Sequence, residues 1–137
     1  MRTTIALMLA AAATAALAQP ASRTDQFVIT FGSNGSAVAG EAVPILDNVA
    51  AAWHQARSSQ VLVEAHTDTA GHEQHNLRLS QRRADSVRAY LIGRGVPDSF
   101  ITSTAFGETK PAVPTGDGVS EPRNRRVEIR LGSPPQQ

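Results

Sequence analysis

The 137-residue chain contains no cysteine, one tryptophan, one tyrosine and almost no net charge. Without cysteine a disulfide framework is excluded, so the fold must be stabilised by its core. Beyond residue 18 the chain holds twelve basic and twelve acidic side chains. Binding to nucleic acid by counterion release needs a basic excess, and so does attachment to an anionic membrane surface. The balanced charge therefore argues against both functions.

The chain also lacks long hydrophobic runs, except at its amino terminus, where 14 of the first 18 residues are apolar. Arg2 precedes this run, and positions 16–18 end it with the small-x-small pattern that signal peptidase cleaves. A transmembrane anchor is the alternative, but the run is shorter than the roughly 20 apolar residues of a membrane-spanning helix. We expect residues 1–18 to be an export signal, with Gln19 as the new amino terminus. No cysteine follows it to carry a lipid.

The remaining residues alternate between strand and helix patterns. β-Branched or alternating apolar residues predict strands at 27–31, 60–67, 100–106 and 127–131, and helical spacing predicts helices at 41–57 and 80–94. We expect Ser80 to be the N-cap of the second helix and Gly95 to end it. The order β-α-β-α-β-β predicts a single α+β domain over 27–131, a mixed sheet with helices packed on one face.

Polar or Pro- and Gly-rich segments separate and flank these elements. Residues 19–26 are expected to form a flexible lead, 107–122 a long loop and 132–137 a disordered tail. The Asn34-Gly35 pair predicts a tight turn after the first strand, because asparagine and glycine tolerate positive φ. These segments frame one compact domain.

Two charged residues break the apolar pattern at one end of the predicted sheet. Arg83 lies four residues before Val87 and so continues the apolar stripe of the second helix. Asp68 follows the second strand, where a crossover to a helix opens a crevice. An acid and a guanidinium in one crevice suit a zwitterion, whose ammonium pairs with the aspartate and whose carboxylate accepts paired arginine N–H groups. An internal Asp68–Arg83 salt bridge explains the same pair, and the residues alone leave both interpretations open.

The spacing of motifs around this pair matches a known pattern. Residues 66–91 read H-T-D and then, from Asn76, N-x-x-L-S-x-x-R-A-x-x-V-x-x-x-L, and residues 124–129 read N-R-R-V-E-I. The chain thus resembles the peptidoglycan-associating domain of OmpA-like proteins over nearly all of 27–131. Ala65 stands where that family usually has glycine, which adds one methyl group near the crevice.

The resemblance implies a ligand for the charged pair. In that family the matching aspartate and arginine bind the diaminopimelate residue of the peptidoglycan stem peptide, and here those positions are Asp68 and Arg83. The same resemblance assigns further residues to the pocket, namely Asn34, Asn76, Thr67, Leu79 and Arg125. It therefore favours a ligand site over an internal salt bridge.

Other constellations are weaker. A metal site could be drawn from His66, Asp68, His72 and His75, but the last three fall in a polar segment without a second strand to supply ligands. A triad of Ser80, His66 and Asp68 is disfavoured, because an N-cap serine already bonds its oxygen to backbone amides. We therefore expect no metal, no cofactor and no catalytic residue.

These observations predict a non-catalytic module in the periplasm of a Gram-negative bacterium that binds peptidoglycan through diaminopimelate. We expect no membrane span in the mature protein, and association with the outer membrane through a partner protein. The main alternative is an envelope adaptor that binds another envelope protein and uses Asp68–Arg83 as a structural salt bridge. A cell-wall hydrolase is less favoured, because no paired carboxylates, nucleophile or metal set is evident.

Overall fold

The computed structural model describes residues 25–57 and 59–132. The expected export signal, residues 19–24 of the expected lead and residues 133–137 of the expected tail lie outside the described residues. Among the helices of the described ranges, none is long and apolar enough to cross a membrane.

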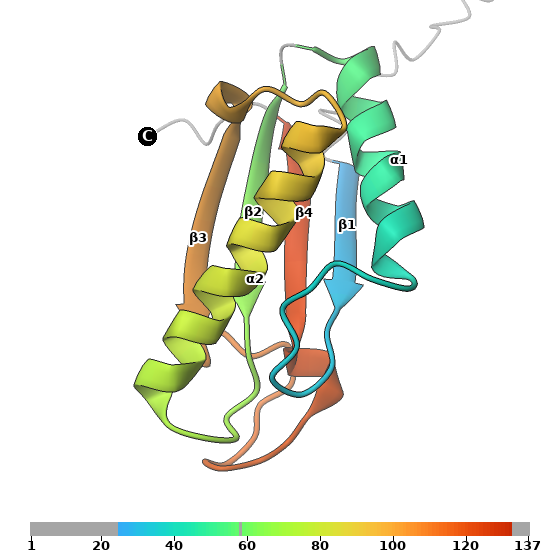
Figure 1. Ribbon diagram of the computed structural model, residues 1–137. Helices are drawn as coiled ribbons and strands as arrows, with labels where there is room; N and C mark the ends of the chain where they lie inside the picture. The colour runs from blue at the N-terminus through green and yellow to red at the C-terminus, as the bar shows by residue number, and fades with distance from the viewer. Residues whose placement is uncertain (1–24, 58, 133–137) are drawn as a thin grey trace, which may run out of the picture.

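The domain consists of a four-stranded sheet and two long helices (Figure 1). The strands are β1 (Asp25–Thr30), β2 (Gln60–His66), β3 (Ile101–Gly107) and β4 (Arg126–Gly132), and the helices are α1 (Ala42–Gln55) and α2 (Glu73–Gly93). The sheet order is β1-β4-β2-β3, in which β4 runs antiparallel to both neighbours and β2 parallel to β3. The predicted α+β class, the element order and the mixed sheet are confirmed.

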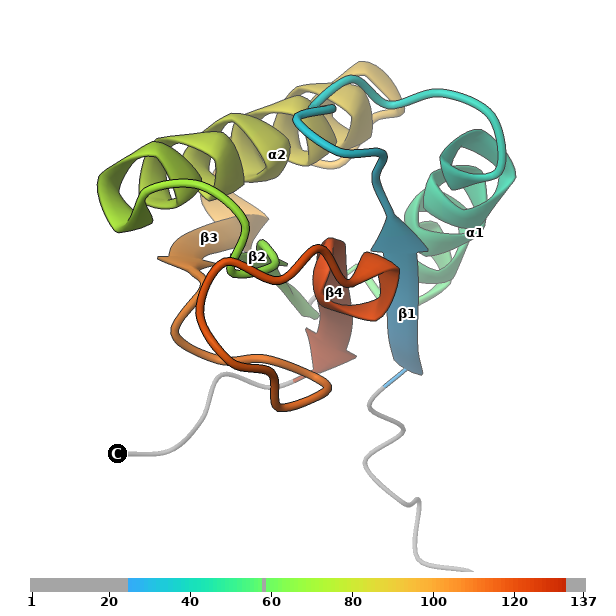
Figure 2. The same ribbon diagram turned by 90° about the horizontal axis from the view of Figure 1, so that it is seen from below.

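Both helices lie on the same side of the sheet (Figure 2). Alternate residues of each strand face them, and in β2 these are Val61, Val63 and Ala65, all fully buried. They pack against the apolar stripes of the helices, represented by Leu46 of α1 and Val87 of α2. The opposite side of the sheet has no helix of the described residues on it, and we call it the open face. The predicted packing on one face is confirmed.

The N-cap position of helix α2 lies eight residues earlier than the sequence predicted, so the assignment of Ser80 as N-cap is wrong. The helix starts at Glu73, with His72 at the N-cap position. Ser80 lies in its interior, where its hydroxyl donates to the carbonyl of Leu77 at 2.8 Å and accepts from the backbone N–H of Gly107 at 2.9 Å. The first two turns are mostly polar, and one of their two leucines, Leu77, is half exposed, so they do not show the apolar period that predicted the rest of the helix. The end of the helix at Gly95, with φ of 91°, is as predicted.

Two boundaries also move outward by a residue or two. Strand β1 includes Asp25 and Gln26, which were expected to belong to the flexible lead, and β4 includes Gly132. In both places pairing between β1 and β4 extends the ladder past the apolar residues, with Asp25 opposite Leu131. At the end of the expected loop, Pro122–Asn124 form one turn of 3-10 helix, which leads into β4.

Gly107 permits a close contact between β3 and α2, which leads to a testable prediction. Its φ is 57°, and a Cβ there would lie 3.2 Å from the Cα and N atoms of Leu77. We expect Gly107→Ala to lower the free energy of unfolding by about 1–3 kcal/mol, because both the backbone and the helix contact become strained. Gly116→Ala is the matched control, since its Cβ would meet nothing within 4 Å. Urea denaturation would measure both, and equal midpoints would contradict this account.

Candidate functional site

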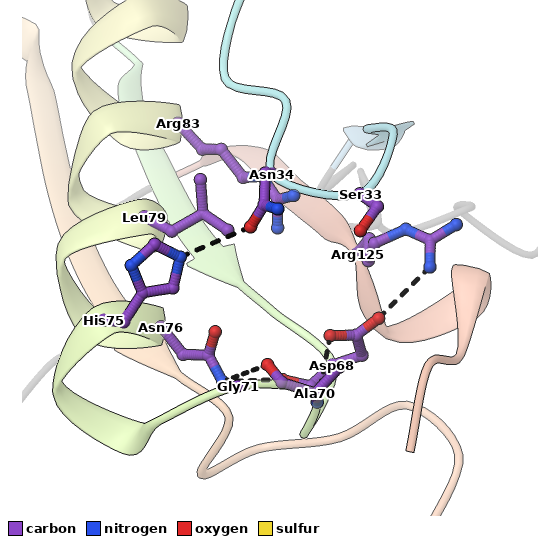
Figure 3. A pocket seen from close by; sticks show the side chains of 10 residues that line it. All are labelled: Ser33, Asn34, Asp68, Ala70, Gly71, His75, Asn76, Leu79, Arg83 and Arg125. Atoms are coloured by element: carbon purple, nitrogen blue, oxygen red, sulfur yellow. Dashed lines mark hydrogen bonds and ion pairs between the residues drawn. The ribbon is translucent and has the colours of Figure 1, made fainter. Parts of the chain in front are cut away.

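A pocket opens where β2 ends, between the loop after β1, the loop after β2 and the first turns of α2. Figure 3 shows its lining, with Arg83 reaching in from α2 and Asp68 and Arg125 on the far side. Six of the seven residues assigned to the site from the sequence line it: Asn34, Asp68, Asn76, Leu79, Arg83 and Arg125. The lining also includes Ser33, Ala70, Gly71 and His75.

The seventh assigned residue, Thr67, supports the pocket from behind. Its side chain is buried, and its hydroxyl donates to the carbonyl of Asp68 at 2.9 Å. Its backbone N–H donates to the carbonyl of Gly107 at 2.8 Å, which continues the pairing of β2 with β3. Thr67 therefore holds the main chain that carries Asp68, and it is not among the lining residues.

Arg83 occupies a different environment from the one that the sequence suggested. Its side chain is 0% exposed. Each of its three nitrogens donates to a main-chain carbonyl: Nε to Gly35 at 2.8 Å, and the terminal nitrogens to His66 at 2.9 Å and Gly32 at 3.0 Å. A guanidinium has five N–H groups, so one N–H on each terminal nitrogen is left over. The arginine thus binds the loop after β1 to the end of β2.

Burial makes the charge of Arg83 costly without removing it. Desolvation lowers the pKa of Arg83 to about 10, while the carboxylate of Asp68 acts in the opposite direction. At neutral pH the guanidinium is therefore still protonated. It also lies over the ring of Phe31, 5.1 Å from the ring centroid, a cation–π contact that partly compensates the lost hydration.

Asp68 pairs with Arg125 instead of Arg83. Its Oδ2 lies 3.1 Å from a terminal nitrogen of Arg125 and accepts from the N–H of Glu121 at 3.2 Å. Its Oδ1 accepts from the N–H of Ala70 at 3.3 Å. The direct Asp68–Arg83 salt bridge that the sequence left open is therefore not formed, and Asp68 pairs with Arg125, 57 positions further along the chain. Arg125 completes its bonds with the hydroxyl of Ser120 and the carbonyl of Phe31.

The rim of the pocket is polar and includes His75, for which the sequence suggested only a possible role as a metal ligand. His75 lies 3.3 Å from Oδ1 of Asn34 through its Nε2. Asn34 has φ of 57°, which confirms the predicted turn with positive φ. His75, Leu79 and Arg83 stand at spacings of four on α2 and so share one helix face. That spacing would have predicted His75 as a residue of the pocket if the helix had been expected to start before position 75.

Asn76 joins the loop after β2 to helix α2. Its Nδ2 donates to the carbonyl of Ala70 at 2.9 Å and to that of Asp68 at 3.3 Å. The side chain is buried, so these bonds form away from competing water. The amide therefore fixes the loop that presents the aspartate to the pocket.

The pocket lining carries more arginine side chains than carboxylates. Two arginines, Arg83 and Arg125, face one carboxylate, Asp68. Asp68 is paired with Arg125, so the direct contacts of the Arg83 guanidinium are with carbonyls and the Phe31 ring, while Asp68 stabilises its charge from a greater distance. The pocket therefore attracts a group with a negative charge and offers a carboxylate to a neighbouring positive one.

An α+β domain with two helices on a mixed sheet and a charged pocket at the end of β2 defines the class of this protein. The family model described as OmpA family matches residues 30–125. The chain belongs to the OmpA family, which confirms the resemblance seen in its motifs.

Relatives and solved structures agree with this assignment. A peptidoglycan-associated lipoprotein of Haemophilus influenzae is 41% identical over 99 residues, which make up 72% of this chain and 65% of that protein. The chain thus spans just under two thirds of the length of this relative. The crystal structure of the peptidoglycan-associated lipoprotein from Burkholderia pseudomallei superposes with a TM-score of 0.70 at 27% identity, over 76% of this chain and 88% of that chain. The cell wall anchor of the T6SS from Pseudomonas aeruginosa does so with a TM-score of 0.66 at 28% identity, over 80% and 81%.

The three carbonyl bonds of Arg83 lead to a prediction about stability. We expect Arg83→Ala to lower the free energy of unfolding by at least about 3 kcal/mol, because it leaves three carbonyls unpaired and a cavity behind them. Arg82→Ala is the matched control: that side chain is exposed, so its loss should change stability by about 0.5 kcal/mol or less. Urea denaturation of the two variants would measure the difference. A similar small loss in both would contradict the structural role.

Proposed function

We propose that this protein binds peptidoglycan non-covalently, without catalysing a reaction, and that its pocket receives the diaminopimelate residue of the stem peptide. Membership of the OmpA family supports the proposal, as do relatives described as peptidoglycan-associated. The expected export signal at residues 1–18 leads us to propose the periplasm of a Gram-negative bacterium as the location, with association to the outer membrane through a partner envelope protein.

The observation that carries the proposal is the unequal charge of the pocket. The distal carbon of diaminopimelate bears both an ammonium and a carboxylate group. Arg83 lines the pocket and its direct hydrogen bonds go to carbonyls, so its positive charge can attract the ligand's carboxylate. Asp68 can accept from the ligand's ammonium while it stays paired with Arg125. A zwitterion therefore meets a partner for each of its charges.

The surroundings of the pocket also suit binding better than catalysis. The hydroxyl of Ser80, the serine once considered for a triad, donates to Leu77 and accepts from Gly107. Asn76 likewise spends its N–H groups on the loop carbonyls of Asp68 and Ala70. The bonds of Asn76 hold the loop that carries Asp68 before any ligand arrives, which lowers the entropy lost on binding.

Sedimentation with purified sacculi tests the proposal. We expect the wild-type protein to sediment with diaminopimelate-containing sacculi, and Asp68→Asn to bind at least tenfold more weakly, because the amide cannot neutralise an ammonium group. Asp85→Asn, an exposed position on α2, is the matched control and should bind like the wild type. Sacculi with lysine in place of diaminopimelate lack the distal carboxylate and should bind more weakly. Equal sedimentation of wild type and Asp68→Asn would overturn the site.

Ligand-induced stabilisation provides a second test that needs no intact cell wall. A soluble stem peptide with diaminopimelate should raise the urea midpoint of the wild type. At a hundredfold excess over its Kd, the free energy of unfolding should rise by about 2.7 kcal/mol. The same peptide concentration should stabilise Asp68→Asn by at least about 1.3 kcal/mol less than the wild type, because its Kd is expected to be at least tenfold higher. A midpoint that rises equally in both proteins would place the ligand elsewhere.

A further inference from the structure

A second cluster of polar side chains lies on the open face of the sheet, away from the pocket. Glu64 of β2 and Glu128 of β4 are direct partners across the antiparallel pair. His66 follows Glu64 by two residues and so lies on the same face. One possible ligand atom from each of the three residues lies within 4.8 Å of the other two. This set differs from the one considered from the sequence, which combined His66 with Asp68, His72 and His75.

The imidazole of His66 has no hydrogen-bond partner of its own among the described residues. The side chain is 1% exposed, and neither ring nitrogen forms a hydrogen bond there. Its Nε2 points into the cluster, 3.6 Å from Oε2 of Glu128. A buried polar group without a partner is rare in folded proteins and calls for a ligand or a partner that completes it.

The ring of His66 is also fixed in direction and protonation state. It stacks on Phe106 with ring centroids 5.3 Å apart and an interplanar angle of 11°. Burial and the nearby charge of Arg126 lower the pKa of His66 to about 4. The imidazole is therefore neutral at neutral pH, and a lone pair on one ring nitrogen is available to a cation without loss of a proton.

Cationic side chains surround the cluster but leave part of each carboxylate free. Oε1 of Glu128 accepts from Nε of Arg126 at 3.3 Å, and Oε1 of Glu64 accepts from Arg130. Each carboxylate thus keeps a second oxygen for another partner. Lys110 lies over the ring of Phe106, 4.2 Å from its centroid, and adds a further positive charge near His66.

We propose that Glu64, His66 and Glu128 bind a divalent transition-metal cation such as Zn²⁺. One imidazole nitrogen and two carboxylate oxygens form a donor set that suits Zn²⁺ better than Mg²⁺ or Ca²⁺, which prefer oxygen ligands alone. Arg126 and Arg130 hold the ligating carboxylates in orientation, as partners of metal ligands commonly do. Their positive charges oppose the cation, so this site is weaker than one formed by the same ligands without them.

This site is separate from the proposed peptidoglycan pocket, since none of its three ligands lines that pocket. It stands or falls independently of peptidoglycan binding. The two regions meet at His66, whose carbonyl accepts a hydrogen bond from Arg83 at 2.9 Å while its side chain faces the metal cluster. A cation bound there would hold the residue that helps to position the pocket arginine.

Titration of the full-length protein with Zn²⁺ alone tests the proposal, with calorimetry for affinity and thermal unfolding for stability. The wild type should bind one equivalent and unfold at a higher temperature. Glu64→Gln, Glu128→Gln and His66→Asn should each weaken this binding at least tenfold. His72→Asn is the matched control, because it removes an exposed imidazole outside the cluster, and it should retain the wild-type affinity.

The two glutamate variants keep the test decisive if His66→Asn does not fold, because both side chains are only partly buried. Wild-type affinity in Glu64→Gln and Glu128→Gln would overturn the proposal, and so would the absence of Zn²⁺ binding up to millimolar concentrations. Loss of binding in His72→Asn alone would assign the cation to the start of α2 and also overturn it.

Discussion

The buried guanidinium of Arg83 is the interaction on which the site depends. It bonds carbonyls of Gly32 and Gly35 after β1 and of His66 at the end of β2, and so joins these two segments. Main-chain carbonyls cannot be left unpaired in a buried position without a large cost, and a single arginine satisfies three of them. Its direct hydrogen bonds go to carbonyls and not to a carboxylate, so the pocket keeps an affinity for anions that a direct ion pair would have reduced.

The pairing of Asp68 with Arg125 complements this arrangement. The Asp68 carboxylate is bound to one arginine and two backbone N–H groups, so it is held in place before a ligand arrives. The same arginine neutralises part of its negative charge. In the proposed complex the ligand's ammonium group would share Asp68 with Arg125. Such competition would favour a ligand that brings its own carboxylate to Arg83 over a simple amine.

Strand β2 and the residues after it contribute to the core, to the open face of the sheet and to the pocket. Successive side chains of the strand alternate in direction. Val63 and Ala65 face the helices and form the core, while Glu64 and His66 face the open side of the sheet. The residues that follow the strand turn into the pocket, where Asp68 lies. A shift of the strand by one residue would expose the core side chains and bury the charged ones, so the register of β2 is strongly specified.

Local patterns in the sequence determined the elements and singled out Asp68 and Arg83, while the family motifs supplied the other residues assigned to the pocket. Apolar alternation and helical spacing predicted each strand and helix, and the departure of Arg83 from an apolar stripe marked it as a special residue. The start of α2 escaped prediction because its first turns are polar, and Ser80 was misassigned for the same reason. Only the tertiary structure decided that Asp68 pairs with Arg125 and that Arg83 bonds carbonyls. Those contacts join residues tens of positions apart, and the free energy of a charge depends on the groups that folding brings around it, which no local pattern encodes.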